Sequence, residues 1–129
     1  MSLRSPLGRV LGLGSAREGV THWWAQRVGA VALVPLCLWL VLSLAALGSL
    51  DHEAVVGFLR QPLNTLLALL LVLAGAHHSY LGVEVVIEDY VHAPAAKITG
   101  LVLSRLAHML AAAAGVFALL RIAFGNHFS

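Results

Sequence analysis

The sequence predicts an all-α membrane protein with three transmembrane helices. Of its 129 residues, 60% are hydrophobic and only 11% are charged, whereas a soluble domain carries about a quarter charged residues. Two intervals of 23 residues, 28–50 and 61–83, contain no Asp, Glu, Lys or Arg. Each is long enough to cross a hydrocarbon core of about 30 Å as a helix. Lipid offers no hydrogen-bond partners to exposed backbone groups, and this favours helices for both intervals.

The third span is less uniform, because Arg105 interrupts it. We expect one membrane-anchor domain covering residues 1–129, with its three spans at about 25–48, 62–88 and 97–122. Residues 1–24 are expected to form a tail and an interfacial segment. Ser15 and Glu18 have the spacing of a capping box, which indicates that a short helix begins near Ser15.

The basic residues predict the orientation of the chain. Four arginines lie before the first charge-free interval: Arg4, Arg9, Arg17 and Arg27. The connection between the first two spans contains only Arg60. The positive-inside rule therefore puts the N-terminus in the cytoplasm. The arginines are too sparse to indicate a nucleic-acid partner.

Two histidines, His77 and His78, lie inside the second span, and His78 is 11 residues before Asp89. This spacing puts His78 about 16 Å from the inner end of the helix. A polar side chain at that depth is costly, so a functional role is the default hypothesis. Gly75 and Gly82 flank His78 at i−3 and i+4. Such small residues would let a haem lie close to the backbone while His78 ligates its iron, but plain helix packing accounts for them equally well.

Other polar residues are candidates for the surroundings of a haem. His77 shares a helical face with Tyr80 and Glu84, so it is expected to hydrogen-bond to a neighbouring helix or to a haem propionate. Arg27 either reaches outward to lipid phosphate or pairs with a propionate, for which its forked donors are suited. A second axial ligand would come from His108 or from a partner subunit, and the spacing leaves both open.

The inner end of the second span carries Asp89 and Tyr90. Both residues could simply be solvated at the membrane boundary. Alternatively, Tyr90 donates a hydrogen bond to a quinone carbonyl while Asp89 orients partners or relays protons. Reduction of a quinone consumes two protons, so an acid and a phenol near the aqueous side suit this chemistry.

Two segments carry a resemblance to a known family: 15–35 (SAREGVTHWWAQRVGAVALVP) and 77–92 (HHSYLGVEVVIEDYVH). They resemble the hydrophobic membrane anchor subunit of succinate dehydrogenase, of the alphaproteobacterial and mitochondrial type. The resemblance implies that His78 is one axial ligand of haem b and that the other comes from a cytochrome b subunit. It also implies that Tyr90 and Asp89 belong to the quinone site and that Arg27 lies near the haem propionates.

The resemblance further implies a four-subunit respiratory complex II in the bacterial inner membrane. A flavoprotein oxidises succinate as part of the tricarboxylic acid cycle, and an iron–sulfur subunit carries the electrons. The two anchor subunits bind haem b and ubiquinone, so this chain alone would catalyse nothing. Two alternatives are the anchor of a quinol:fumarate reductase and a small proton- or metal-conducting bundle that uses His77, His78 and Glu84.

Overall fold

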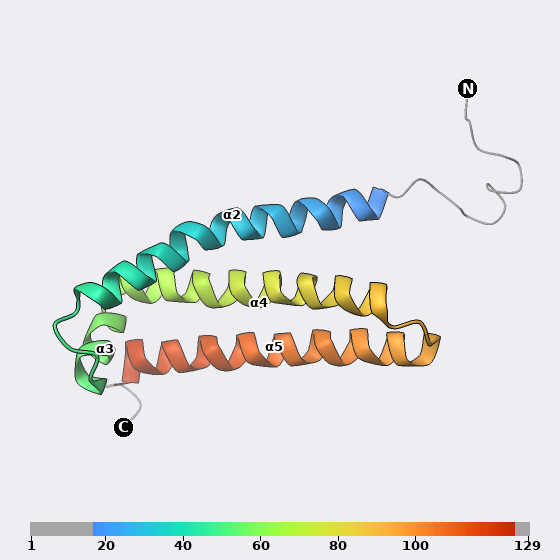
Figure 1. Cartoon of the computed structure of the whole chain (residues 1–129). Helices are drawn as coiled ribbons and strands as arrows, with labels where there is room; N and C mark the ends of the chain where they lie inside the picture. Colours follow the sequence, from blue (N-terminus) through green and yellow to red (C-terminus); the bar gives the residue numbers. More distant parts are fainter. Residues whose placement is uncertain (1–16, 126–129) are drawn as a thin grey trace, which may run out of the picture.

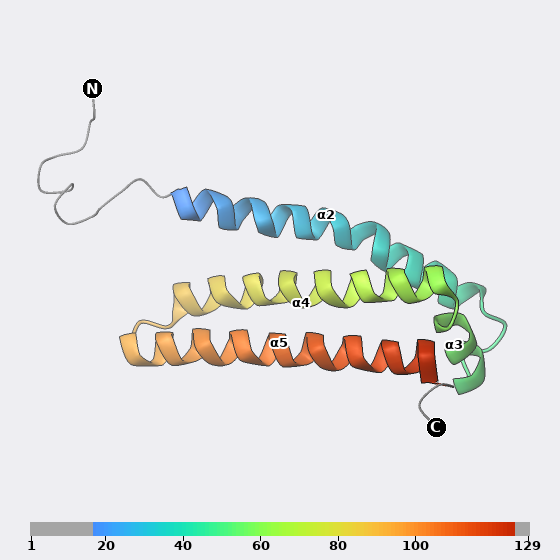
Figure 2. The same cartoon turned by 180° about the vertical axis from the view of Figure 1, so that it is seen from behind.

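The computed structural model describes residues 17–125, with side chains from Val20 onward. This part of the chain forms the helices α2 (Arg17–Ala46), α3 (His52–Leu59), α4 (Pro62–Tyr90) and α5 (Pro94–Phe124). The three long helices lie side by side, with α4 in the middle (Figure 1, and from behind in Figure 2). Each is long and apolar enough to cross a membrane. The predicted all-α architecture with three spans is therefore confirmed.

The helix boundaries differ from the sequence expectation in two places. Residues 17–24, which were expected to lie in the tail and interfacial segment with a short helix of its own, are continuous with the first span in helix α2. The capping box proposed at Ser15 lies outside the described residues. The connection before α4 contains the extra helix α3. Asp51 caps α3, because its carboxylate accepts a 2.8 Å hydrogen bond from the N–H of Ala54. This bond lowers the pKa of Asp51, and the hydroxyl of Ser49 lowers it further.

Helices α4 and α5 pack in a regular antiparallel register. Gly100 lies against Ile87, Gly115 lies against Val72, and the hydroxyl of Ser79 is 3.1 Å from Nε2 of His108. The residue numbers of each of these three pairs add to 187. One register therefore holds over about four turns of both helices.

Helix α2 packs against the other side of α4, also antiparallel. Gly29 lies against His78, Gln26 lies against Gly82, and His22 bonds to Glu84. The residue numbers of these pairs add to between 106 and 108. Towards its C-terminal end, α2 bends across the start of α4 (Figure 1), and this helix contains Pro35, a residue that bends helices.

The closest contact between α4 and α5 predicts a difference between two glycines. A Cβ atom at Gly115 would lie 2.8 Å from Cγ1 of Val72, whereas a Cβ at Gly75 would meet no atom within 4 Å. We expect Gly115→Ala to cost about 1–3 kcal/mol through overpacking. Gly75→Ala should instead be neutral or slightly stabilising, since alanine favours the helix. Thermal unfolding followed by circular dichroism in detergent checks both variants. Equal stabilities would contradict the close approach at Gly115.

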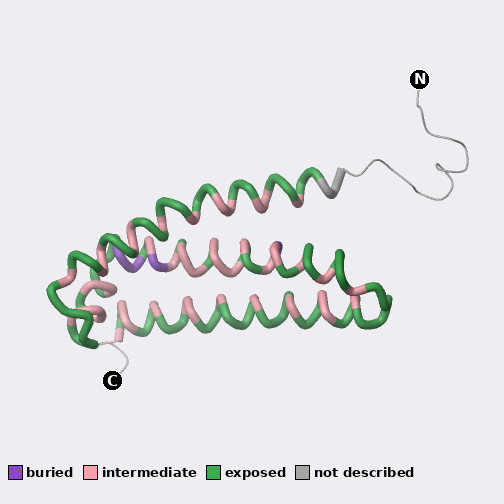
Figure 3. The backbone as a smooth tube through the Cα atoms, viewed as in Figure 1, coloured by how far each residue is buried: buried purple, intermediate pink, exposed green. Residues whose placement is uncertain are grey.

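The described part of the chain buries very little of itself (Figure 3). Only Asn64, Thr65, Ala68 and Leu81 are buried. The two polar ones join α3 to α4: Asn64 donates to the carbonyl of Phe58 at 3.0 Å and Thr65 to that of Leu59 at 2.6 Å. Most apolar side chains on the long helices are exposed. Lipid or other protein chains must therefore cover them.

Candidate functional site

His78 lies on the side of α4 that packs against α2. A Cβ atom on Gly29 would be 3.5 Å from Nδ1 of His78 and 3.7 Å from its Cβ, so the imidazole lies directly over this glycine. Nδ1 is buried and has no hydrogen-bond partner within the described chain. Burying a polar nitrogen without a partner is unfavourable. His78 is thus held in place by packing, and this nitrogen is not used by the fold.

Two other histidines are used by the fold. Nε2 of His22 is 2.8 Å from a carboxylate oxygen of Glu84, which links α2 to α4. Nδ1 of His108 is 2.7 Å from the carbonyl of Ser104, a geometry in which the ring N–H donates, and its Nε2 then accepts from the hydroxyl of Ser79. His108 faces the α5 side of α4 and His78 faces the α2 side. The structure therefore does not bring these two histidines to one site.

The glycines beside His78 lie in different surroundings. Gly82 lies against α2, since a Cβ there would be 3.6 Å from Nε2 of Gln26. Gly75 has open space around it. The two glycines that flank His78 therefore differ: Gly82 takes part in helix packing, whereas Gly75 borders open space.

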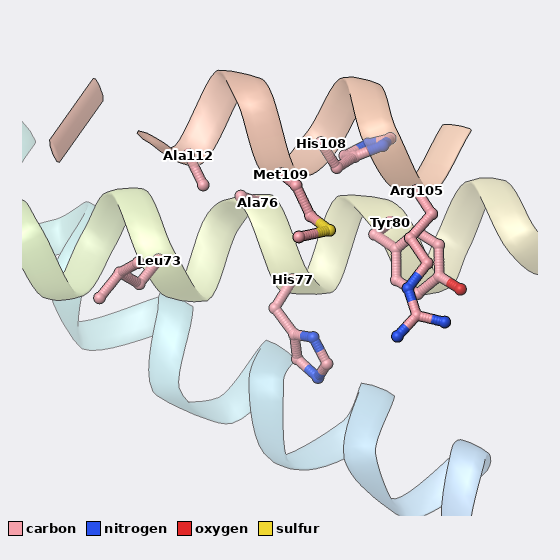
Figure 4. Close-up of a pocket in the computed structure, with 8 residues that line it drawn as sticks. All are labelled: Leu73, Ala76, His77, Tyr80, Arg105, His108, Met109 and Ala112. Carbon is pink, nitrogen blue, oxygen red and sulfur yellow. The ribbon is translucent and has the colours of Figure 1, made fainter. Parts of the chain in front are cut away.

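His77 is one of the residues that line a cavity of about 310 Å³. All of the lining residues belong to α4 and α5, and the His77 imidazole points away from α5 (Figure 4). The cavity is lined by Leu73, Ala76, His77, Tyr80, Arg105, His108, Met109 and Ala112. The expected hydrogen bond from His77 to a neighbouring helix is not formed with any described residue. Instead, Tyr80 donates to Glu84 at 2.9 Å, and Glu84 in turn contacts His22.

Arg27 does not point towards α4, because Gln26 and Gly29 occupy that face of α2. Its guanidinium lies 5.0 Å from the centre of the Trp23 ring, in a cation–π contact on an exposed surface. Within the chain, Arg27 and His77 therefore do not form a common site.

Asp89 and Tyr90 form the last turn of α4, and both are exposed. Tyr90 is 77% exposed, and among the described residues neither its hydroxyl nor the Asp89 carboxylate has a hydrogen-bond partner. Two nearby side chains contact backbone carbonyls at the end of α4. Lys97 donates to the carbonyl of Glu88 at 2.7 Å, and Nδ1 of His92 is 3.1 Å from the carbonyl oxygen of Tyr90. Both side chains are free to bind something outside the chain.

The sequence reasoning missed the α2 side of this site. It assigned no role to His22, Gln26 or Gly29. A signal was available, since positions 22, 26 and 29 have the i, i+4, i+7 spacing of one helical face. This face contacts α4 at Glu84, Gly82 and His78.

Comparison with known proteins shows the family of this chain. A family model described as "Succinate dehydrogenase/Fumarate reductase transmembrane subunit" matches residues 1–120. The succinate dehydrogenase hydrophobic membrane anchor subunit of Paracoccus denitrificans is 35% identical over 115 residues, which cover 88% of each chain. That of Rickettsia bellii is 35% identical over 88 residues, 68% of this chain and 70% of its own. The succinate dehydrogenase membrane anchor subunit of Reclinomonas americana is 32% identical over 93 residues. The chain is thus a multi-pass membrane protein that belongs to the family of succinate dehydrogenase and fumarate reductase transmembrane subunits.

Proposed function

We propose that this chain, with its N-terminus in the cytoplasm, anchors a succinate dehydrogenase in the bacterial inner membrane. Its partners in this proposal are a cytochrome b anchor subunit, an iron–sulfur subunit and a flavoprotein. Oxidation of succinate to fumarate releases two electrons and two protons, and reduction of ubiquinone to ubiquinol takes up two of each. The reaction therefore balances without another reductant or oxidant.

One observation carries the haem part of the proposal. Unlike His22 and His108, His78 makes no hydrogen bond within the described chain, and its Nδ1 is buried against Gly29. A haem brings its own four equatorial nitrogens, so one imidazole from this chain and one axial ligand from a partner would complete the coordination of its iron. Haem b would supply one-electron redox chemistry beside the quinone site. His78 fits this role, because ligating the iron would not break any bond of the fold.

The quinone part of the proposal uses the last turn of α4. The Tyr90 hydroxyl would donate a hydrogen bond to a ubiquinone carbonyl, and this bond strengthens as negative charge develops on that oxygen. The Asp89 carboxylate would orient the partners of Tyr90 or accept and release a proton. Both side chains are exposed and unpaired in the described structure, and so are accessible to a ligand held between subunits.

The family includes anchors that run the reverse reaction, from quinol to fumarate. We favour succinate oxidation, because the relatives compared above are named succinate dehydrogenase subunits. The direction is a property of the complete complex and does not alter the proposed roles of His78 or Tyr90.

Affinity purification through a tag on this chain tests the proposal most directly. After mild detergent extraction, a flavoprotein and an iron–sulfur protein should co-purify in equal amounts with the tagged chain. The preparation should reduce ubiquinone with succinate faster than it reduces fumarate with ubiquinol. If the chain purifies without either soluble subunit, the proposed function is wrong. If both subunits are present but the fumarate rate is higher, only the direction is wrong.

A further inference from the structure

Arg105 is a cation within the apolar helix α5, and the described residues provide no ion-pair partner for it. It is exposed, and it makes no hydrogen bond or ion pair with the described residues. In the close-up, its guanidinium extends over α4 beside Tyr80 (Figure 4). The Glu84 carboxylate is bonded to His22 at 2.8 Å and to Tyr80 at 2.9 Å and forms no ion pair with Arg105. A charged group within a membrane span is expected to pair with something.

The cavity beside Arg105 changes from polar to apolar along the helices. Its polar lining residues lie towards the N-terminal end of α5 and the C-terminal end of α4: Arg105, Tyr80, His108 and His77. Three of its apolar lining residues lie further into the membrane span, namely Leu73, Ala76 and Ala112, and Met109 lies level with the two histidines. This order matches a molecule with a polar head and an apolar tail. Because Arg105 is always charged, the head that best complements it is an anion.

The helix registers show where the polar end of this cavity lies. The α4–α5 register puts Arg105 opposite Gly82, and the α2–α4 register puts Arg27 opposite Tyr80. Together with Glu84, these charges from three helices fall within four residues of one another, or about 6 Å along α4. We take this shared level as the edge of the hydrocarbon core.

The other end of α5 is consistent with this edge. Arg121 lies 16 residues beyond Arg105, which is about 24 Å along the helix. This length is shorter than a hydrocarbon core of about 30 Å. Both arginine side chains can extend outward to the headgroups and so make up the missing length. Trp23 and Trp24, both exposed, lie about one turn outside Arg27, as expected of an interfacial aromatic belt. The mouth of the cavity thus lies where lipid headgroups are found.

We propose that this cavity binds an anionic phospholipid from the leaflet on the N-terminal side of the membrane. Its phosphate pairs with the Arg105 guanidinium, which can donate two hydrogen bonds to one phosphate. Tyr80 and His108, which lie at the next levels of the cavity after Arg105, line the headgroup. The acyl chains extend over Leu73, Met109 and Ala112 towards the middle of the membrane. The occupied site covers apolar surface of α4 and α5 that the chain leaves exposed.

Lipid rebinding to the membrane complex purified through this chain tests the proposal. The complex is stripped of lipid with detergent and then titrated with either phosphatidylglycerol or zwitterionic phosphatidylcholine. The readouts are the thermal unfolding midpoint and the bound lipid measured by mass spectrometry. The variants are Arg105→Gln and, as a matched control on the opposite end of the same helix, Arg121→Gln.

We expect phosphatidylglycerol to raise the midpoint of the wild type and of Arg121→Gln more than phosphatidylcholine does. Arg105→Gln should bind phosphatidylglycerol about tenfold more weakly, because it loses a charge-assisted pair of hydrogen bonds. Equal binding of phosphatidylglycerol by Arg105→Gln and the wild type would overturn the proposal. So would a loss of haem in Arg105→Gln with unchanged lipid binding, because the partner of Arg105 would then be a haem propionate. An equal response to both lipids would overturn the requirement for an anion.

Discussion

His78→Ala is expected to remove the b-type haem from the assembled complex. The reduced-minus-oxidised absorbance spectrum of the wild type should show a b-type band, and this band should fall to background in the variant. The physical reason is the loss of an axial ligand that no other histidine on the three long helices can replace. His22 and His108 are engaged in hydrogen bonds, and His77 lines the cavity between α4 and α5.

The matched control is His77→Ala, which removes an imidazole one position away on the same helix. This variant should keep the band, because neighbouring helical positions point about 100° apart. Co-purification of the soluble subunits shows that each variant still assembles, so that a lost band reports ligation and not misfolding. Full haem content in an assembled His78→Ala complex would exclude His78 as the ligand. A band lost in His77→Ala but kept in His78→Ala would exchange the two assignments.

Tyr90→Phe is expected to slow succinate-dependent reduction of ubiquinone by about tenfold, the effect of losing one hydrogen bond to a group that becomes charged during the reaction. Transfer of electrons from succinate to a water-soluble artificial acceptor should not change, because that reaction does not need the quinone site. Steady-state assays of both reactions on the same preparation give the comparison.

Tyr80→Phe is the matched control for this prediction. It removes the same hydroxyl from the same helix, but this hydroxyl donates to Glu84 and lies about 15 Å from Tyr90 along α4. Ubiquinone reduction should therefore be close to the wild-type rate. If Tyr90→Phe lowered both activities equally, the role of Tyr90 would be structural. If Tyr80→Phe slowed ubiquinone reduction as much as Tyr90→Phe does, the quinone would have to lie nearer the cavity than the end of α4.

The three spans could be predicted from sequence because they depend on composition over long intervals. The charge-free intervals 28–50 and 61–83 indicated two helices directly, and the third followed despite Arg105. Helix α3 was not predicted. It is only eight residues long, and its capping by Asp51 and its attachment through Asn64 and Thr65 depend on local geometry and packing.

The partners of the polar side chains were harder to predict, because they depend on the register between helices. His22 and Glu84 are 62 positions apart in the sequence, and nothing in either local pattern indicates their contact. The same is true of Gly29 and His78. The sequence did identify His78 as a residue of interest, since a histidine in an apolar span stands out by composition alone. It could not show that His78 packs against α2, or that its buried Nδ1 has no hydrogen-bond partner in the described chain.

The small amount of buried surface affects the steady-state amount of this protein in the cell. A chain whose described part buries only four residues gains little of its stability from its own interior, so most of it must come from the molecules that cover its helices. Copies made in excess of their partners would leave Arg105, His77 and Tyr90 unpaired at the membrane surface and in the span. Membrane proteases act on such incompletely covered chains. The steady-state amount of this subunit should therefore follow the synthesis of its partners more closely than the synthesis of the subunit itself.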